Sequence, residues 1–272
     1  MYSDSARCLE ILHDPVMSRA AGAGTVSAGK WIATLAGQSC NLYRDMNAVA
    51  ASDIAMTAVA ASETAMEAVI SGTIALNAVA ASKTAMAAVA ASRVAMSAII
   101  GNSTALNAVV TSSVAMAAII GNSTALNAVV SSSTAMAAIA SFQTAMAAVI
   151  NSEAARTALV SSSDARKALK ASSLAVEMSL VSSDGQYWNS AGTKTMRGLI
   201  LYTKAGNTDN AFTITKVDST TLASNNNARN AATSGSTGYK DWLEAFPNSS
   251  WVLSSITFYA YYRTTKIKYI PC

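Results

Sequence analysis

Residues 101–130 read GNSTALNAVV TSSVAMAAII GNSTALNAVV, three ten-residue units in one register, of which the first and third are identical. The same register extends from Asn47 to Val176, so that alanine recurs at every tenth residue from Ala48 and again from Ala55. The second alanine is followed by a large apolar residue, mostly Met or Leu, and the first by Val, Ile or Leu. This internal repeat determines how the middle of the chain is organised.

The spacing within one unit favours a short helix. Ala55, Met56, Ala58 and Val59 fall on one helical face, and Ala and Met are strong helix formers, whereas Ala is depleted in strands. A continuous helix fits badly, because ten residues advance by about 1000° and the apolar face would rotate by about 80° in each unit. We therefore expect about seven helical residues and a short turn in every unit.

Small polar residues mark the start of each predicted helix. An N-cap side chain at these positions would satisfy the first free N–H groups of the helix. The predicted N-caps are Ser52, Ser62, Ser82, Ser92, Asn102, Ser112, Asn122, Ser132 and Ser152. Gly72, Gly101 and Gly121 lie at or beside the same point, where left-handed helix stops would lie. The Ser and Thr columns could also form an ice-binding or saccharide-binding array, although caps and turns already explain them.

Helices this short require neighbours, which could be successive units of the chain or other copies of it. From Val94 to Ser152 the sequence has no charged residue, which predicts tight packing through alanine and an oligomeric state. The methionine column is expected to fill the core rather than to bind a metal or a cofactor.

Composition excludes several classes of protein. The chain of 272 residues is 51% hydrophobic, 6% aromatic and 12% charged, so it is neither disordered nor an average globular enzyme. A net charge of +4 without a run of Lys or Arg gives no sign of nucleic-acid binding. Polar residues interrupt every apolar stretch, so we expect no membrane insertion, and the N-terminus lacks the apolar run of a secretory signal.

The two ends differ from the repeat. After Val181 the chain is rich in aromatic residues, and strands are predicted at 197–203, 211–217, 256–263 and 266–270, with a hairpin turn at Gly206-Asn207 and a surface loop at 225–239. Residues 1–46 hold an apolar helix candidate at Cys8–Leu12 and a second apolar segment at 30–36, and form a cap or an attachment. The predicted domains are 1–46, 47–180 and 181–272. The predicted fold is α+β and elongated: a shaft of short-helix decapeptide repeats, then a small antiparallel β-sandwich-like domain or small barrel.

Signals for catalysis or metal binding are weak. His13 is the one histidine, so a nucleophilic triad would have to include it. A zinc site built from Cys8, Cys40 and His13 lacks a C-x2-C pair and a fourth ligand. Cys8, Cys40 and Cys272 are an odd number at wide spacing, which does not indicate a disulfide framework. We expect no enzymatic activity, no metal and no cofactor.

Two further patterns point to no specific chemistry. Gly22, Gly24 and Gly29 match no phosphate-binding motif, and we expect them in a loop. A carboxylate pair for glycoside hydrolysis could be chosen among the acids of the C-terminal part, but any β domain holds as many. These acids are Asp184, Asp209, Asp218, Asp241 and Glu244.

Aromatic residues of the C-terminal part are the candidates for binding. Exposed Trp and Tyr beside polar residues offer stacking faces and hydrogen bonds to sugars or protein surfaces, although most such residues belong to a core. The candidates are Trp188, Tyr239, Trp242, Trp251, Tyr259 and Tyr261. Of these, Tyr239, Trp242, Tyr259 and Tyr261 are the predicted receptor-binding residues.

The whole layout resembles a bacteriophage tail fibre. The resemblance lies in the decads, best seen in Ser132-Ser133-Thr134-Ala135-Met136-Ala137-Ala138-Ile139, and covers about half of the chain. It implies a homotrimeric virion protein that is made in the host cytoplasm without a signal peptide. Its N-terminus would attach to the phage tail or baseplate, and its C-terminus would bind a host surface polysaccharide or an outer-membrane protein.

Two alternatives remain. A cellular surface adhesin of similar construction would need a signal and an anchor. A tailspike enzyme that degrades glycans would need a long β-helix, for which the sequence has no pattern.

Overall fold

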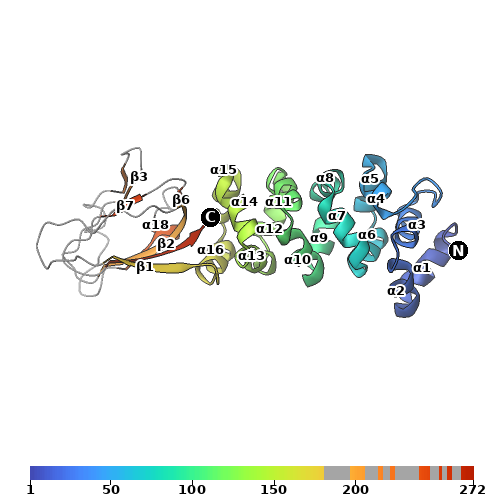
Figure 1. The fold of residues 1–272 in the computed structure, drawn as a ribbon, viewed down its shortest axis with the longest axis horizontal. Helices are drawn as coiled ribbons and strands as arrows, with labels where there is room; N and C mark the ends of the chain where they lie inside the picture. The colour runs from blue at the N-terminus through green and yellow to red at the C-terminus, as the bar shows by residue number, and fades with distance from the viewer. Residues whose placement is uncertain are drawn as a thin grey trace, which may run out of the picture. The chain divides into compact units, whose positions relative to one another are not determined.

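A computed structural model describes residues 1–180, 197–205, 214–216, 221–223, 239–245, 251–252, 256–258 and 265–272. These residues form two compact units, Met1–Ala148 and Val149–Cys272 (Figure 1). The described structure is mostly helical, with a small antiparallel β part near the C-terminus. The expected combination of helical and β structure is therefore confirmed at that level.

The first unit consists of short helices, and α14 reaches into the second unit. Their bounds are α1 (Ser5–His13), α2 (Pro15–Gly22), α3 (Thr25–Leu35), α4 (Met46–Ala50), α5 (Asp53–Ala61), α6 (Glu63–Ser71), α7 (Thr73–Ala81), α8 (Lys83–Ala91), α9 (Arg93–Ile100), α10 (Ser103–Thr111), α11 (Ser113–Ile120), α12 (Ser123–Val130), α13 (Ser133–Ile139) and α14 (Gln143–Asn151).

A single extended residue separates several consecutive helices. Ser62, with φ −101° and ψ 118°, ends α5 and starts α6. Its N–H donates to the carbonyl of Val59 at 3.1 Å, while its hydroxyl and carbonyl accept from the amides of Ala65 and Met66 at 3.2 and 3.0 Å. One residue thus satisfies groups of both helix ends. The pairs α5–α6, α7–α8, α9–α10 and α11–α12 are bent by 94° to 104°.

All the predicted N-caps are confirmed, because each of these Ser and Asn side chains accepts from an amide in the first turn of its helix. Two details were wrong. The helices from α5 to α12 have eight or nine residues rather than about seven, because the chain needs only one or two residues to change direction. Gly101 and Gly121 have φ −74° and −75° and Gly72 has φ −114°, so none is a left-handed stop.

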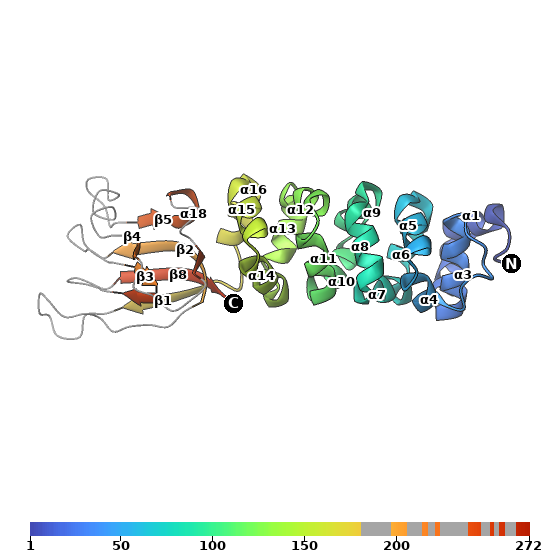
Figure 2. The same cartoon turned by 90° about the horizontal axis from the view of Figure 1, so that it is seen from above.

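Each helix of the repeat packs on the helix three places further along. Contacts join α5 with α8, α8 with α11, α6 with α9, and α9 with α12, as well as immediate neighbours. The chain therefore forms a coil with three helices in each turn, and Figure 2 shows α4, α7 and α10 following one another along one side. Ser112 donates to the carbonyl of Ala80 at 2.6 Å, and Ser82 to that of Ala50 at 2.5 Å, from one turn to the previous one.

The core of the repeat lies inside this coil. In α5 the buried residues are Ala55, Met56, Val59 and Ala60, each with at most 1% of its surface exposed. The expected filling of the core by methionine is confirmed, since Met56 and its equivalents up to Met146 are buried. Ala58, expected on the buried face, is half-buried instead, because Ala60 beside the bend takes the inner position. The short helices therefore pack on other repeats of the same chain, which was one of the two arrangements that the sequence left open.

The N-terminal helices α1, α2 and α3 pack on one another and on α6. The expected helix at Cys8–Leu12 is confirmed within α1, and the indole N–H of Trp31 in α3 donates to the carbonyl of Cys8 at 3.0 Å. The expectation of a glycine loop was wrong. Gly22 ends α2, Gly29 lies within α3, and Gly24 is the N-cap of α3, separated from α2 by Ala23 alone.

In the second unit, α15 (Glu153–Ser161) and α16 (Ser163–Lys170) continue the ten-residue spacing. In these two ten-residue repeats, Arg156 and Arg166 stand at the position that methionine occupies in most earlier repeats. Their guanidinium groups donate to the carbonyls of Ile150 and Val160 at 2.7 and 2.5 Å. Cations are favourable at these helix C-termini because carbonyl groups are unpaired there.

The β part contains two sheets with antiparallel pairing. The strands are β1 (Val176–Leu180), β2 (Gly198–Ala205), β3 (Ile214–Lys216), β4 (Thr221–Ala223), β5 (Tyr239–Asp241), β6 (Trp251–Val252), β7 (Ile256–Phe258) and β8 (Thr265–Pro271), and α18 (Trp242–Ala245) follows β5. One sheet has the order β1-β8-β2-β5, with β6 also paired to β2, and the other has the order β4-β3-β7. Figure 2 shows β8 between β1 and β2.

Strands are confirmed in all four predicted segments. β2 and β8 extend beyond the predicted bounds, and the residues that follow β3 and β7 lie outside the described residues. The predicted hairpin between the first two strands was wrong, because β2 and β3 belong to different sheets and β8 and β5 already flank β2. Gly206-Asn207 and most of the predicted loop at 225–239 lie outside the described residues.

Candidate functional site

The first compact unit, Met1–Ala148, is called the helical unit below. Its exposed residues form three sides that differ in chemistry. The outward residues of α8 and α11 include Ala87 and Ala117, so this side is apolar. The side of α9 and α12 instead carries Ser97 and Asn127 at the equivalent positions, and α10 carries Asn107. Identical inner columns therefore support outer surfaces of different chemistry.

A polar groove lies between α9 and α12, and we call it the Arg93 groove. Its volume is about 400 Å³. It is lined by Arg93, Ser97, Ser123, Thr124, Asn127, Ala128 and Ser131. A neighbouring groove of about 480 Å³ shares Arg93 and Ser97 and is completed by Glu63, Val94 and Ala98. Arg93 thus lines two adjoining hollows on the same side.

An apolar groove of about 540 Å³ lies between α8 and α11, and we call it the alanine groove. Lys83 and Asn122 are among its polar lining residues. Most of the other lining residues are small, namely Ala87, Ala90, Ser113, Val114, Ala117, Ala118 and Gly121. Lys83 and Arg93 therefore occupy the same position in consecutive helices but line grooves of opposite character.

The N-terminal helices bury two thiols. Cys8 in α1 and Cys40 in the α3–α4 loop are free and buried. Burial raises the pKa of Cys8, and the nearby carboxylate of Asp4 raises it further. A protonated thiol is a poor nucleophile, so Cys8 is not arranged for covalent catalysis. Its partner in the zinc hypothesis, His13, is exposed at the end of α1.

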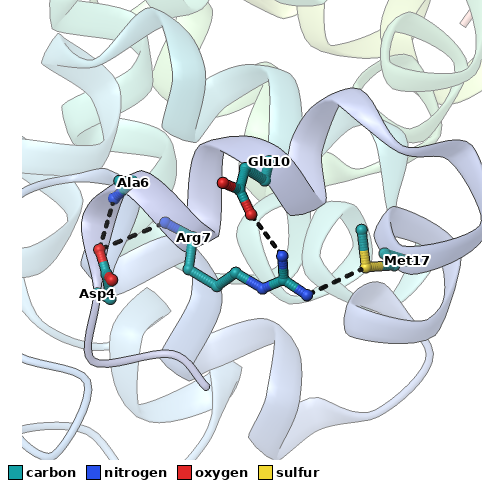
Figure 3. A network of polar contacts seen from close by, with 5 residues as sticks. All are labelled: Asp4, Ala6, Arg7, Glu10 and Met17. Carbon is teal, nitrogen blue, oxygen red and sulfur yellow. Dashed lines mark hydrogen bonds and ion pairs between the residues drawn. The ribbon is translucent and has the colours of Figure 1, made fainter.

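Polar contacts fix the surface of α1 (Figure 3). Asp4 caps the helix by accepting from the amide of Ala6 at 2.9 Å, and Arg7 pairs with Glu10 one turn on. The second guanidinium nitrogen of Arg7 lies 3.9 Å from the sulfur of Met17 in α2. The contact of Arg7 with Met17 joins α1 to α2, whereas the other two lie within α1, and exposed pairs of this kind add little stability.

The predicted receptor-binding residues are only partly described. Tyr239 lies in β5, opposite Lys204 of β2, and Trp242 is the first residue of α18. Tyr259 and Tyr261 lie outside the described residues, as does Trp188, while Trp251 lies in β6. The structure therefore brings Tyr239 and Trp242 to consecutive elements, and the binding role of all four residues stays a prediction.

Ionic contacts position α18 beside the helices of the second unit. Lys170 at the end of α16 pairs with Glu244 in α18 at 2.7 Å, and this hydrogen bond lowers the pKa of Glu244. Within the sheet, the hydroxyl of Tyr202 bonds to Glu177. Of the acids considered for hydrolysis, Asp184, Asp209 and Asp218 lie outside the described residues.

Metal and membrane sites were also sought in the described part of the chain. There, no three His, Cys, Asp or Glu side chains gather as a metal site would require. None of the described helices is by itself long and apolar enough to cross a membrane, and five bent pairs of helices pass that test only by length and composition.

Comparison of the sequence with family models gives no match, and comparison with curated proteins gives none either. The function must therefore be inferred from the residues and their arrangement. The sequence did not identify the Arg93 groove, because its two sides are thirty residues apart and the number of helices in each turn is not visible in a ten-residue repeat. One signal was present, since Arg93 is one of two charged residues between Glu67 and Glu153.

Proposed function

We propose that the chain is a phage tail fibre, a virion protein whose repeat is an elongated spacer and whose C-terminal β-sandwich-like domain binds a host surface polysaccharide or outer-membrane protein. Residues 1–46 attach it to the tail or baseplate, residues 47–180 form the shaft, and residues 181–272 form the tip. Three chains assemble in the virion after synthesis in the host cytoplasm. Trimerisation would strengthen weak tip contacts by raising their effective concentration.

One observation carries this proposal. Successive helices of the helical unit bury the same types of residue at ten-residue intervals, so further ten-residue repeats can be added without a new core. Such quasi-one-dimensional packing suits a spacer, because length changes while every local contact is kept. The grooves along the described repeat contain no arrangement of acid, base and nucleophile, which supports a binding role over an enzymatic one.

Deletion of the tip tests the proposal in particles that carry the protein. We choose a cut before Val176 rather than before Val181, because β1 pairs with β8 and would otherwise keep an unpaired edge. We expect particles with the truncated chain to assemble and to lose adsorption to host cells. Far-UV circular dichroism of the purified fragment should still show the helical unit, which controls for misfolding. Unchanged adsorption would refute the tip assignment.

The mass and shape of the purified full chain test the assembly. Light scattering with negative-stain imaging should show a thin rod of three chains with a knob at one end. A compact monomer would contradict both the spacer and the trimer.

A further inference from the structure

Two positive charges lie in a long stretch of the repeat that contains no acidic residue. Between Glu67 and Glu153 the charged residues are Lys83 and Arg93 alone. Each is exposed at the first position of its helix. Within the described part of the chain neither forms an ion pair. Glu63 lines one of the two hollows that Arg93 lines, but no ion pair joins them, and a cation without an ion pair beside a groove favours an anionic ligand.

The surroundings of these two cations differ. Around Arg93 the lining supplies the hydroxyls of Ser97, Ser123 and Thr124 and the amide of Asn127, with Ala128 as an apolar residue. Around Lys83 the lining is mostly Ala, Gly and Val. Of these two grooves, only the Arg93 groove combines a positive charge with several hydroxyl groups that can donate and accept hydrogen bonds.

The repeat contains an internal comparison. Residues 101–110 and 121–130 have the same sequence, so α10 and α12 expose the same Asn side chain, at Asn107 and Asn127. The helix one turn before α12 is α9, which begins with Arg93, whereas the helix one turn before α10 is α7, which begins with Thr73. The position in the coil, rather than the local sequence, creates the groove.

We infer that the Arg93 groove binds an acidic saccharide, with Arg93 paired to a sugar carboxylate and with Ser97, Thr124 and Asn127 bonded to sugar hydroxyls. The planar fork of a guanidinium group matches a carboxylate, and hydroxyl and amide groups both donate and accept. The two adjoining hollows have volumes typical of small-ligand sites. This inference does not rest on the proposed function, because the groove lies in the repeat and not in the tip.

A titration of the full chain with a short oligogalacturonate, followed by ligand-observed NMR, tests the inference. We expect saturable binding that weakens with added salt. Arg93→Ala should weaken binding by about tenfold or more, because a charge-assisted hydrogen bond is lost. Lys83→Ala is the matched control, since it removes the same charge from the equivalent helix position and should leave binding unchanged.

Two further variants separate groove contacts from general charge. Asn127→Ala should weaken binding, whereas Asn107→Ala, in the identical decad, should not. Glu63→Gln should tighten binding, because Glu63 lines the hollow next to Arg93 and its negative charge repels a carboxylate. Thermal unfolding of each variant confirms that the exposed substitutions leave the fold intact.

The choice of ligand makes the test decisive. The methyl ester of the same oligosaccharide keeps the sugar hydroxyls but not the negative charge, and it should bind much more weakly. The absence of saturable binding to oligogalacturonate would overturn the inference, as would equal weakening by Arg93→Ala and Lys83→Ala. Equally tight binding of inorganic phosphate would show an unspecific anion patch and would overturn the saccharide assignment.

Discussion

Gly29 lies inside α3 where the backbone of α4 begins. A Cβ atom added at this residue would be 2.5 Å from the carbonyl carbon of Asp45 and 2.6 Å from the nitrogen of Met46. These atoms belong to the backbone, so no side chain can move aside to make room. The close approach is needed because Asp45 caps α4 there, accepting from the amide of Ala48 at 3.0 Å.

Replacing Gly29 by alanine should destabilise the helical unit by about 1–2 kcal/mol, because overpacking outweighs the better helix propensity of alanine. The measurement is the denaturant midpoint of the helical signal. Gly22→Ala is the matched control, because its Cβ would meet its nearest neighbour, the Cα of Gly72, at an ordinary 3.6 Å. Equal midpoints for the two variants would contradict the steric explanation.

Single residues show what local pattern could predict. Ser62 and Ser92 were identifiable as N-caps because a cap depends on the residue and the few residues after it. Gly101 was misjudged, because a helix can also end with a right-handed residue when a cap for the next helix follows at once, as Asn102 does. Gly29 was misjudged because its requirement comes from α4, which is distant in sequence.

Some N-cap serines also form a hydrogen bond to the previous turn of the coil, and this bond adds to the stability that the cap gives its own helix. The hydroxyl of Ser112 accepts from the amide of Ala115 at 3.2 Å and donates to the carbonyl of Ala80 at 2.6 Å. Ser132 accepts from the amide of Ala135 at 3.2 Å, and among the described residues it makes no such bond to the previous turn. Ser112 thus both caps its helix and links two turns of the coil, whereas Ser132 only caps its helix.

Ser112→Ala should therefore cost about 2 kcal/mol and Ser132→Ala about 1 kcal/mol, since the first loses a cap and a hydrogen bond between turns, and the second loses a cap alone. The free energies of unfolding of the two variants give the difference directly. An equal or larger loss for Ser132→Ala would show that the bond between turns contributes nothing.

At the scale of elements the period of ten predicted short helices, yet it did not predict three helices in each turn. That number follows from the bend of about 100° at residues such as Ser62, which is set by one pair of backbone angles. The stacking of α12 on α9 follows from it, and so does the Arg93 groove. No local pattern in residues 93 or 127 indicates that they lie on neighbouring helices.

At the scale of the whole molecule, the core of the helical unit is complete within one chain. Met56, Met86 and Met116 have 0% of their surface exposed in the isolated chain. The lack of charge between Val94 and Ser152 thus reflects an alanine-rich coil and does not by itself require a second chain. Whatever holds three chains together in the proposed trimer must use other surfaces.

The helical unit should consequently unfold at the same denaturant concentration over roughly a hundredfold range of protein concentration, because a unit whose core is complete within one chain does not depend on mass action for its stability. Far-UV circular dichroism of the full chain measures this transition. Tryptophan fluorescence provides the comparison, because most tryptophans lie after Val181 and a trimer held together by the tip would shift that signal with concentration. A helical midpoint that rises with concentration would show that copies of the chain share the stability of the coil.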